Sequence, residues 1–145
     1  MIKITFAVVG KIKEIFYREA VAEYTKRLSR FAEVKIVEVA ECRTLAEEAE
    51  LLKRACRGTV FVLAVEGKKY SSEGFASKIK QYTDRGGELT FVIGSSYGLD
   101  ETFKKQADEA ISFSDMTFPH QLMRVILAEQ VYRAFMINSG SEYHK

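Results

Sequence analysis

Three short segments contain residue types that could carry out chemistry. In the first, the polar loop from Phe113 to Phe118 runs into a long helix at Pro119, the chain's only proline. A proline at a helix start loses no intrahelical hydrogen bond, and the free N–H groups after it form the positive end of a dipole. Backbone groups of the loop can read a base edge while Phe113, Met116 and Phe118 supply apolar walls. This segment predicts a pocket for an adenosine-like ligand.

His120, on the first turn of that helix, has two interpretations. The imidazole could act as a catalytic base. A histidine there is more often structural, with a hydrogen bond near the helix cap, and the structural interpretation is favoured.

The second segment is the tail, Tyr143-His144-Lys145. Most chain ends fray and have no function. An aromatic ring, a titratable imidazole and a cation nevertheless occupy the last three positions, and this set can hold a nucleobase and move a proton. The sequence alone leaves both interpretations open.

The third segment, Gly94-Ser95-Ser96-Tyr97-Gly98, satisfies the G-x-S-x-G pattern of a hydrolase nucleophile elbow. Partners follow in a permitted order, Asp108 or Asp115 and then His120 or His144. The alternative is that two glycines let a loop turn sharply at the carboxyl edge of a sheet, where open α/β folds bind ligands. The short chain and the lack of an HGGG-type loop favour this alternative. Phosphate-loop and dinucleotide-binding glycine patterns are absent.

Length and composition predict a single domain spanning residues 1–145, because 145 residues with 47% apolar content suit one ordinary core. The formal charge of +2, from 22 basic and 20 acidic residues, argues against a protein that grips nucleic acid by bulk charge. An RNA recognised by its shape stays possible. Cys42 and Cys56 have no metal-binding or redox spacing, so we expect free thiols and no metal. Without an apolar run of membrane-spanning length, the chain is expected to be soluble and cytoplasmic.

Strands and helices must position these three segments. Along the chain, β-branched runs alternate with helical patterns, and this alternation predicts an α/β fold with a mostly parallel sheet flanked by helices. Strands are expected at residues 2–9, 34–39, 59–65, 89–93 and 110–113. Helices are expected at residues 13–29, 72–85, 100–107 and 119–139. A further helix, the second along the chain, is expected to begin with a capping box at residues 44–47. The first helix should bury the stripe Phe16, Ala20, Tyr24 and Leu28.

The final helix has very few polar residues, which form a narrow stripe of Arg124, Glu129, Gln130 and Arg133. A helix that is apolar nearly all round must be buried on most sides. One face against its own sheet and another against a second subunit explains this pattern, so the helix predicts a homodimer.

Several motifs together resemble the RlmH family of small SPOUT-class methyltransferases. They are residues 91–94 with 98–99, 112–125, 129–134 and the tail 143–145. The similarity covers essentially the whole chain, and includes residues 8–11, 23–28 and 66–74. The carboxyl-terminal motifs are highly specific, whereas the early ones are supportive.

The resemblance implies a trefoil-knotted SPOUT domain that forms a homodimer and binds S-adenosylmethionine in the knot. It implies methylation of N3 of a pseudouridine in 23S ribosomal RNA, on assembled ribosomes, with neither membrane nor metal. The cofactor-binding residues would be Leu63, Gly94, Phe113, Ser114, Asp115, Met116, Thr117 and Phe118.

N3 of a uracil-type ring is a weak acid, so a base must remove its proton before it attacks the methyl group. The expected catalytic residues are His144 as the base, Tyr143 to position the nucleobase, and Arg133 to meet developing negative charge. Arg124 and Lys145 are expected to bind substrate phosphate.

The chain departs from the family's pattern at three places. Ser95 stands where a second glycine is common, and Glu142 where proline is frequent. The region 41–50 is short. A serine hydrolase and a non-catalytic ribosome-binding module are the alternative functions.

Overall fold

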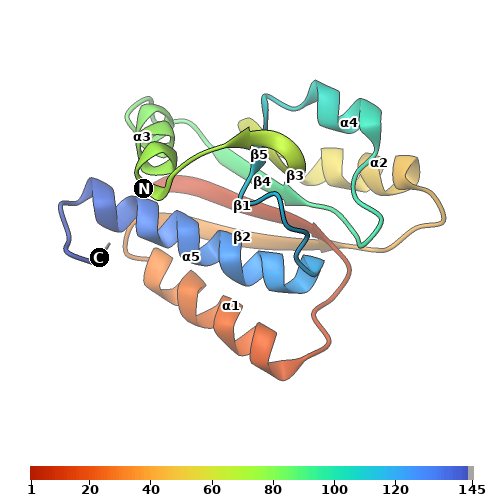
Figure 1. Ribbon diagram of the computed structural model, residues 1–145, viewed down its shortest axis with the longest axis horizontal. Coiled ribbons are helices and arrows are strands. Elements are labelled where there is room, and N and C mark those ends of the chain that lie inside the picture. The colour runs from red at the N-terminus through yellow and green to blue at the C-terminus, as the bar shows by residue number, and fades with distance from the viewer. Residues whose placement is uncertain (144–145) are drawn as a thin grey trace.

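The computed structural model describes residues 1–143 as a parallel sheet with helices on both faces (Figure 1). The strands are β1 (Ile2–Val9), β2 (Ala32–Val39), β3 (Thr59–Lys69), β4 (Leu89–Ile93) and β5 (Glu109–Ser112). They lie in the order β2-β1-β4-β3-β5, and every pair of neighbours is parallel. The α/β fold with a parallel sheet is therefore confirmed.

Five helices alternate with the strands along the chain. They are α1 (Ile15–Leu28), α2 (Leu45–Ala55), α3 (Ser72–Thr83), α4 (Glu101–Gln106) and α5 (His120–Asn138). The predicted capping box is confirmed, since the Thr44 hydroxyl accepts a hydrogen bond from the Glu47 amide at 3.1 Å.

The sheet separates two hydrophobic cores. One contains Phe6, Phe61, Phe91 and Leu127 and is covered by α1, α3 and α5. The other contains Ala7, Val62, Leu52 and Phe103 and is covered by α2 and α4. In Figure 1, α2 and α4 lie above the sheet and α1 and α5 lie below it, while α3 stands at one end.

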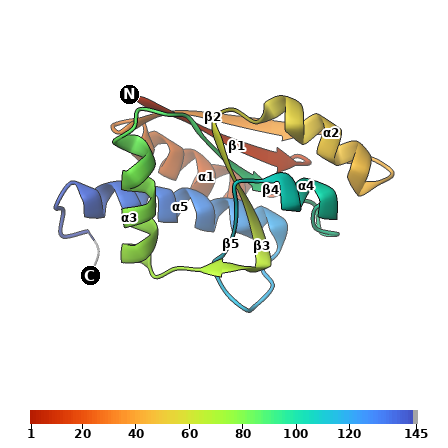
Figure 2. The same ribbon diagram turned by 90° about the horizontal axis from the view of Figure 1, so that it is seen from above.

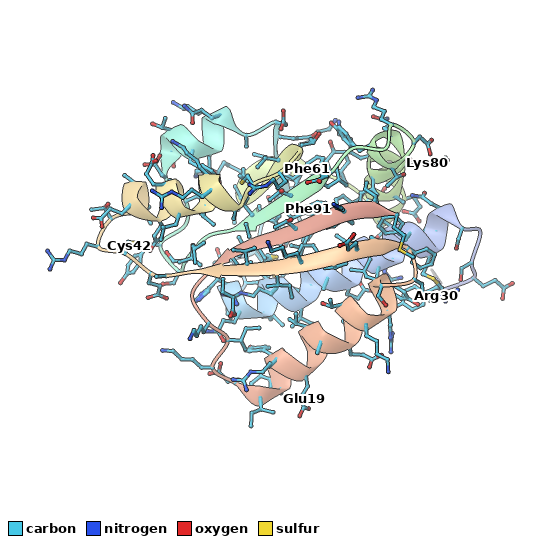
Figure 3. The ribbon with its side chains drawn as sticks, turned by 180° about the vertical axis from the view of Figure 1, so that it is seen from behind. Glu19, Arg30, Cys42, Phe61, Lys80 and Phe91 are labelled. Carbon is cyan, nitrogen blue, oxygen red and sulfur yellow. The ribbon has the colours of Figure 1, made fainter. Side chains whose placement is uncertain are left out.

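The central strand β4 is buried along its whole length, which explains why its bounds match the sequence prediction. A strand covered on both faces needs a continuous apolar run, and such a run is easily recognised. The rings of Phe61 on β3 and Phe91 on β4 stack with centroids 5.2 Å apart, in the interior seen in Figure 3.

Strand β3 is longer than predicted and is interrupted by a bulge. Ile111 of β5 pairs with both Leu63 and Lys68, so residues 64–67 leave the ladder. Gly67 is needed there, because a Cβ atom would lie 2.7 Å from the backbone of β5. The sequence predicted a strand that ends at Val65, whereas the strand resumes as far as Lys69.

The apolar stripe predicted for α1 is wrong at its first position. Leu28 is fully buried and Tyr24 packs against the core, but Phe16 is 63% exposed. Ile15 beside it is 64% exposed. The N-terminal part of α1 therefore presents apolar side chains to the outside.

Within residues 1–143 no helix has the length and apolar character needed to cross a membrane. Cys42 and Cys56 are both free thiols.

Candidate functional site

A cavity of about 620 Å³ lies at the carboxyl ends of β3, β4 and β5. Open α/β sheets bind their ligands at this edge. Seven of the eight residues predicted to hold a cofactor line it together: Leu63, Gly94, Phe113, Ser114, Met116, Thr117 and Phe118. The loop that joins β5 to α5 projects beside β3 in Figure 2 and forms one wall.

The eighth residue, Asp115, does not line the cavity. Its exposed carboxylate forms an ion pair with Lys69 on the outer side of the loop. The sequence could not distinguish Asp115 from its neighbours. An irregular loop has no regular alternation of side chains, so the sequence does not show which of its residues face the cavity.

The loop is shaped by its own serine side chains. The Ser112 hydroxyl donates to the Ser114 carbonyl at 3.0 Å, and the Ser114 hydroxyl accepts from the Met116 amide at 3.0 Å. Phe113 anchors the start of the loop through an edge-to-face contact with Phe75 of α3, with ring centroids 5.7 Å apart. These local bonds hold the apolar side chains of the loop around the cavity.

Gly94, at the end of β4, closes the cavity floor. A Cβ atom there would lie 2.4 Å from the carbonyl oxygen of Gly98, so no side chain fits. Gly98 has φ of 87° and an amide that bonds the Ser95 carbonyl, which makes the turn that brings its backbone back to Gly94. The hydroxyl of Ser95 accepts from the Tyr97 amide at 3.2 Å and is thus used within the turn.

The bulge of β3 adds a charged group that the sequence did not suggest as part of the site. Glu66 pairs with Lys104 of α4 at 2.7 Å, and both residues line the cavity. The hydrogen bond from Lys104 lowers the pKa of Glu66, and Glu66 raises the pKa of Lys104. Both groups are therefore ionised at neutral pH, at the rim of an otherwise mostly apolar cavity.

His120 also lines the cavity, at the start of α5. Pro119 is the N-cap and no side chain caps the helix, so the hydrogen bond expected of His120 near the cap does not form among residues 1–143. Burial is the main cause that lowers the pKa of His120, with a further contribution from Arg124. The imidazole is therefore neutral at pH 7.

Arg124 is not placed to bind a substrate phosphate, in contrast to the sequence prediction. The residue is 4% exposed, and its guanidinium donates to the Val9 and Gly10 carbonyls, both at 2.8 Å. It also pairs with Glu38 at 3.0 Å. Arg124 instead fixes the first turns of α5 to the ends of β1 and β2.

The tail folds back onto the other end of α5, where it joins a charged and aromatic cluster. The Tyr143 ring contacts Tyr132 edge to face at 5.0 Å, and the Arg133 guanidinium lies 4.9 Å from the centre of the Tyr143 ring. Glu129 accepts from Arg133 at 2.5 Å and from the Tyr143 hydroxyl at 3.2 Å. Two of the predicted catalytic residues are thus brought together, whereas His144 and Lys145 lie outside the described residues.

Burial and the charge of Glu129 raise the pKa of Tyr143, so the phenol keeps its proton at neutral pH. The hydrogen bond to Glu129 raises the pKa of Arg133, which stays a cation. The tyrosine can therefore donate a hydrogen bond but is a poor proton acceptor.

Residues at the start of α5 line the cavity, whereas the tail cluster involves residues in the second half of this helix and beyond it. Figure 1 shows α5 running along one side of the sheet, with its two ends far apart. Glu129 follows His120 by nine residues, which is about 14 Å at the rise of an α-helix. The tail turns back after α5 ends at Asn138, but Tyr143 returns only as far as Tyr132 and Glu129, in the second half of the helix. One chain therefore does not bring the two groups of residues together through this helix.

The Gly94–Gly98 segment does not have the geometry of a nucleophile elbow. An elbow holds its serine in a strained turn between a strand and a helix. No residue other than glycine has positive φ among residues 1–143, and α4 begins only at Glu101. The alternative interpretation, a glycine turn at the sheet edge, describes this segment.

A model of a protein family described as "Predicted SPOUT methyltransferase" matches residues 2–144. A protein of Levilactobacillus brevis named "Ribosomal RNA large subunit methyltransferase H" is 51% identical over 157 residues, covering 98% of this chain and 99% of that protein. A protein of the same name from Bifidobacterium adolescentis is 48% identical and covers 99% of both chains. The alignments are longer than this chain of 145 residues, so this chain lacks residues that the relatives possess.

Solved structures share the fold at low sequence identity. A "probable methylase family protein" from Haemophilus influenzae has a TM-score of 0.59 at 10% identity, covering 98% of this chain and 70% of that one. A structure from Legionella pneumophila, described as a "putative methyltransferase" that is "in complex with the bound cofactor SAM", has a TM-score of 0.54 at 11% identity, covering 92% of this chain and 66% of that one.

Proposed function

We propose that this chain, which belongs to the RlmH family of SPOUT methyltransferases, methylates N3 of a pseudouridine in 23S ribosomal RNA. Membership makes it a methyltransferase that uses S-adenosylmethionine and implies the trefoil knot of the family. The relatives are named for the large-subunit ribosomal RNA, which supplies the substrate class. The observation that carries the proposal is the cavity at the carboxyl edge of the sheet, which gathers seven of the eight expected cofactor residues.

The cavity suits S-adenosylmethionine in shape and in chemistry. At Gly94 the floor is made of backbone, because the Gly98 backbone packs too closely to admit a Cβ atom. Phe113, Met116 and Phe118 offer apolar contact to an adenine, and the backbone of the loop between β5 and α5 offers hydrogen bonds to its edge. When bound, this cofactor supplies an electrophilic methyl group on a sulfonium.

The tail cluster contains groups that can assist N3 of the nucleobase, a weakly acidic nitrogen, as it loses its proton before methyl transfer. The Arg133 cation stabilises the negative charge that develops as N3 loses its proton. The Tyr143 phenol, protonated at neutral pH, positions the nucleobase by stacking or hydrogen bonding. Neither group is a good base, and we therefore assign proton removal to His144, with Lys145 at a neighbouring phosphate.

A homodimer brings the two groups of residues together. Because the cavity and the tail lie at opposite ends of α5, we propose that the tail of one subunit completes the cavity of the other. Leu122, Val125 and Ile126 of α5 are only half-buried, and the exposed Ile15 and Phe16 lie on α1, which packs beside it. These apolar side chains form the proposed subunit contact.

Mixed dimers test this arrangement. Gly94→Val disables only the cavity, and His144→Ala disables only the tail. If the tail acts in trans, mixing and refolding the two inactive variants restores activity, because one site of each heterodimer has both parts intact. If the mixture stays inactive although heterodimers form, the tail acts within its own subunit.

We propose the assembled ribosome in the cytoplasm as the substrate. A chain with a formal charge of +2 has little bulk attraction for free RNA and depends on a preformed surface to place the nucleotide. The test measures transfer of labelled methyl groups from S-adenosylmethionine to ribosomes that lack the modification, followed by mapping of the modified nucleotide. Equal rates on a short free hairpin would contradict the ribosome requirement.

The same assay separates the two alternative functions. A non-catalytic ribosome-binding module would bind ribosomes without methyl incorporation. A serine hydrolase would react with a fluorophosphonate probe at Ser96, and the Ser96→Ala variant would lose that reaction.

A further inference from the structure

A second cleft, of about 670 Å³, lies on the α2 face of the sheet and shares no residue with the cofactor cavity. Four cationic residues line it: Lys3 of β1, Lys35 of β2, Arg54 near the end of α2, and Arg57 just beyond it. We call this group the cationic cleft. Its carboxylates are those of Glu33 and Glu88, so cations outnumber anions.

The cationic cleft exists because α2 covers only part of its face of the sheet. Ala7 and Val9 of β1 pack into the core beneath α2, but Lys3 on the same face is exposed. In the parallel register Lys3 lies beside Glu33, and Thr5 lies beside Lys35. Parallel sheets are normally covered on both faces by apolar contacts. This sequence instead places charged residues on an open part of the sheet.

The cations of the cleft are available for a ligand. Within residues 1–143, no ion pair joins Lys3, Lys35 or Arg54 to a carboxylate, whereas Lys78, Lys104 and Arg133 each have one. Arg57 donates to the carbonyls of Arg54 and Cys56, both at 2.8 Å, and so closes the end of α2. Arg54 sits in the last turn of α2, where a cation also favours the helix dipole. The helix dipole cannot account for the two lysines, which lie on strands.

We propose that the cationic cleft binds phosphates of the ribosomal RNA, at a second contact beyond the methylated nucleotide. This inference rests on the proposed function. Charge complementarity favours RNA, because lysine and arginine provide most phosphate contacts. Lysine is depleted at protein–protein interfaces, which argues against a protein partner. The cleft lies on the opposite face of the sheet from α5, so the proposed dimer leaves it open.

A charge-reversal experiment tests the cleft. The variant Lys3→Glu/Lys35→Glu is compared with Arg43→Glu/Lys105→Glu, which makes the same change in net charge outside the cleft, at exposed cations that form no ion pair within residues 1–143. We measure binding to ribosomes over a range of salt concentrations. Removing two phosphate contacts should reduce the steepness of log K against log salt by about 1.4 to 1.8 and weaken binding about tenfold or more. The control variant should keep the slope of the wild-type protein.

The controls separate this inference from the function on which it rests. Both variants should keep the melting temperature and the affinity for S-adenosylmethionine of the wild-type protein, and Lys3→Arg/Lys35→Arg should keep the wild-type slope. Equal slopes for the cleft variant and the wild type would overturn the proposal, as would an equal loss in both reversal variants. A photoreactive residue at position 35 that crosslinks to ribosomal protein rather than RNA would also overturn it. Failure of the wild-type protein to methylate ribosomes would instead contradict the proposed function.

Discussion

The cavity at the N-terminal end of α5 consists mainly of backbone and apolar side chains, whereas the cluster at its C-terminal end consists of charged and aromatic side chains. At the cavity, affinity depends on shape, because Gly94 leaves no space for even one added carbon. At the tail cluster, Glu129 holds both Arg133 and Tyr143, so its function depends on charge and proton state. Substitutions at the cavity should therefore affect binding of the cofactor, whereas substitutions at the tail cluster should affect methyl transfer to the nucleobase.

The largest effect is expected at the cavity. Gly94→Val should reduce the affinity for S-adenosylmethionine at least about 100-fold, or about 2.7 kcal/mol, because the side chain must displace the Gly98 backbone. Isothermal titration calorimetry measures the change. Gly87→Ala is the matched control, because a Cβ atom there meets nothing within 4 Å. Normal affinity in a folded Gly94→Val protein would show that the cofactor lies elsewhere.

At the tail cluster, Arg133→Met should lower kcat about 100-fold and leave the affinity for S-adenosylmethionine unchanged, because it removes charge stabilisation of the transition state. Single-turnover methyl transfer on ribosomes and calorimetry measure the two quantities separately. The control is Arg27→Met, which removes another cation next to Tyr132 from an exposed ion pair with Glu23. A parallel loss of cofactor affinity in Arg133→Met would end the distinction between the two ends of α5.

Arg124 distinguishes a structural role from a substrate contact. Arg124→Met should lower the free energy of unfolding by about 1–3 kcal/mol, because it leaves the Val9 and Gly10 carbonyls without their donor. Urea unfolding measures this loss. Glu38→Gln should cost less, since that carboxylate is 35% exposed. Unchanged stability combined with weaker ribosome binding would restore the phosphate contact expected from the sequence.

The smallest effect concerns pH and His120. Burial lowers the pKa of His120 in the folded chain, while the unfolded chain binds the proton near the ordinary value of about 6.5. The stabilising contribution of the neutral imidazole is therefore complete above about pH 6.5. It is lost as the pH falls below about 6.5 and through the lowered pKa of His120 in the folded chain. Urea midpoints of the wild type and His120→Gln should differ more at pH 5 than at pH 8, with the wild type losing more stability in acid. An identical pH dependence would show that the histidine is solvated in the folded chain.

Elements with one clear physical cause could be predicted from the sequence. Ile2–Val9 and Leu89–Ile93 are apolar runs long enough for buried strands, and their bounds match the structure. The Thr44 cap follows from a local hydrogen bond between near neighbours. The position of the cavity also followed, because a loop before a helix at a sheet edge is a common ligand site.

The remaining features depend on contacts between distant residues. The bulge at residues 64–67 arises where β3 pairs with β5. The sequence of residues 64–69 alone does not indicate that the strand resumes after the bulge. Arg124 appeared to lie on a polar stripe, but it shares an inward face with Leu127 and Val131. A helix that is apolar nearly all round gives no indication of which side faces the core, so a single arginine could be assigned to either side.

The position of β4 in the sheet has a consequence for the order of folding. β1 pairs only with β2 and β4, and β3 pairs only with β4 and β5. Until residues 89–93 leave the ribosome during synthesis, the β1–β2 pair and β3 have no hydrogen-bonded connection within the sheet. Contacts between residues so distant in sequence form slowly, and apolar strands stay exposed in the meantime. A nascent chain halted before Leu89 should therefore be an aggregation-prone intermediate that depends on chaperones.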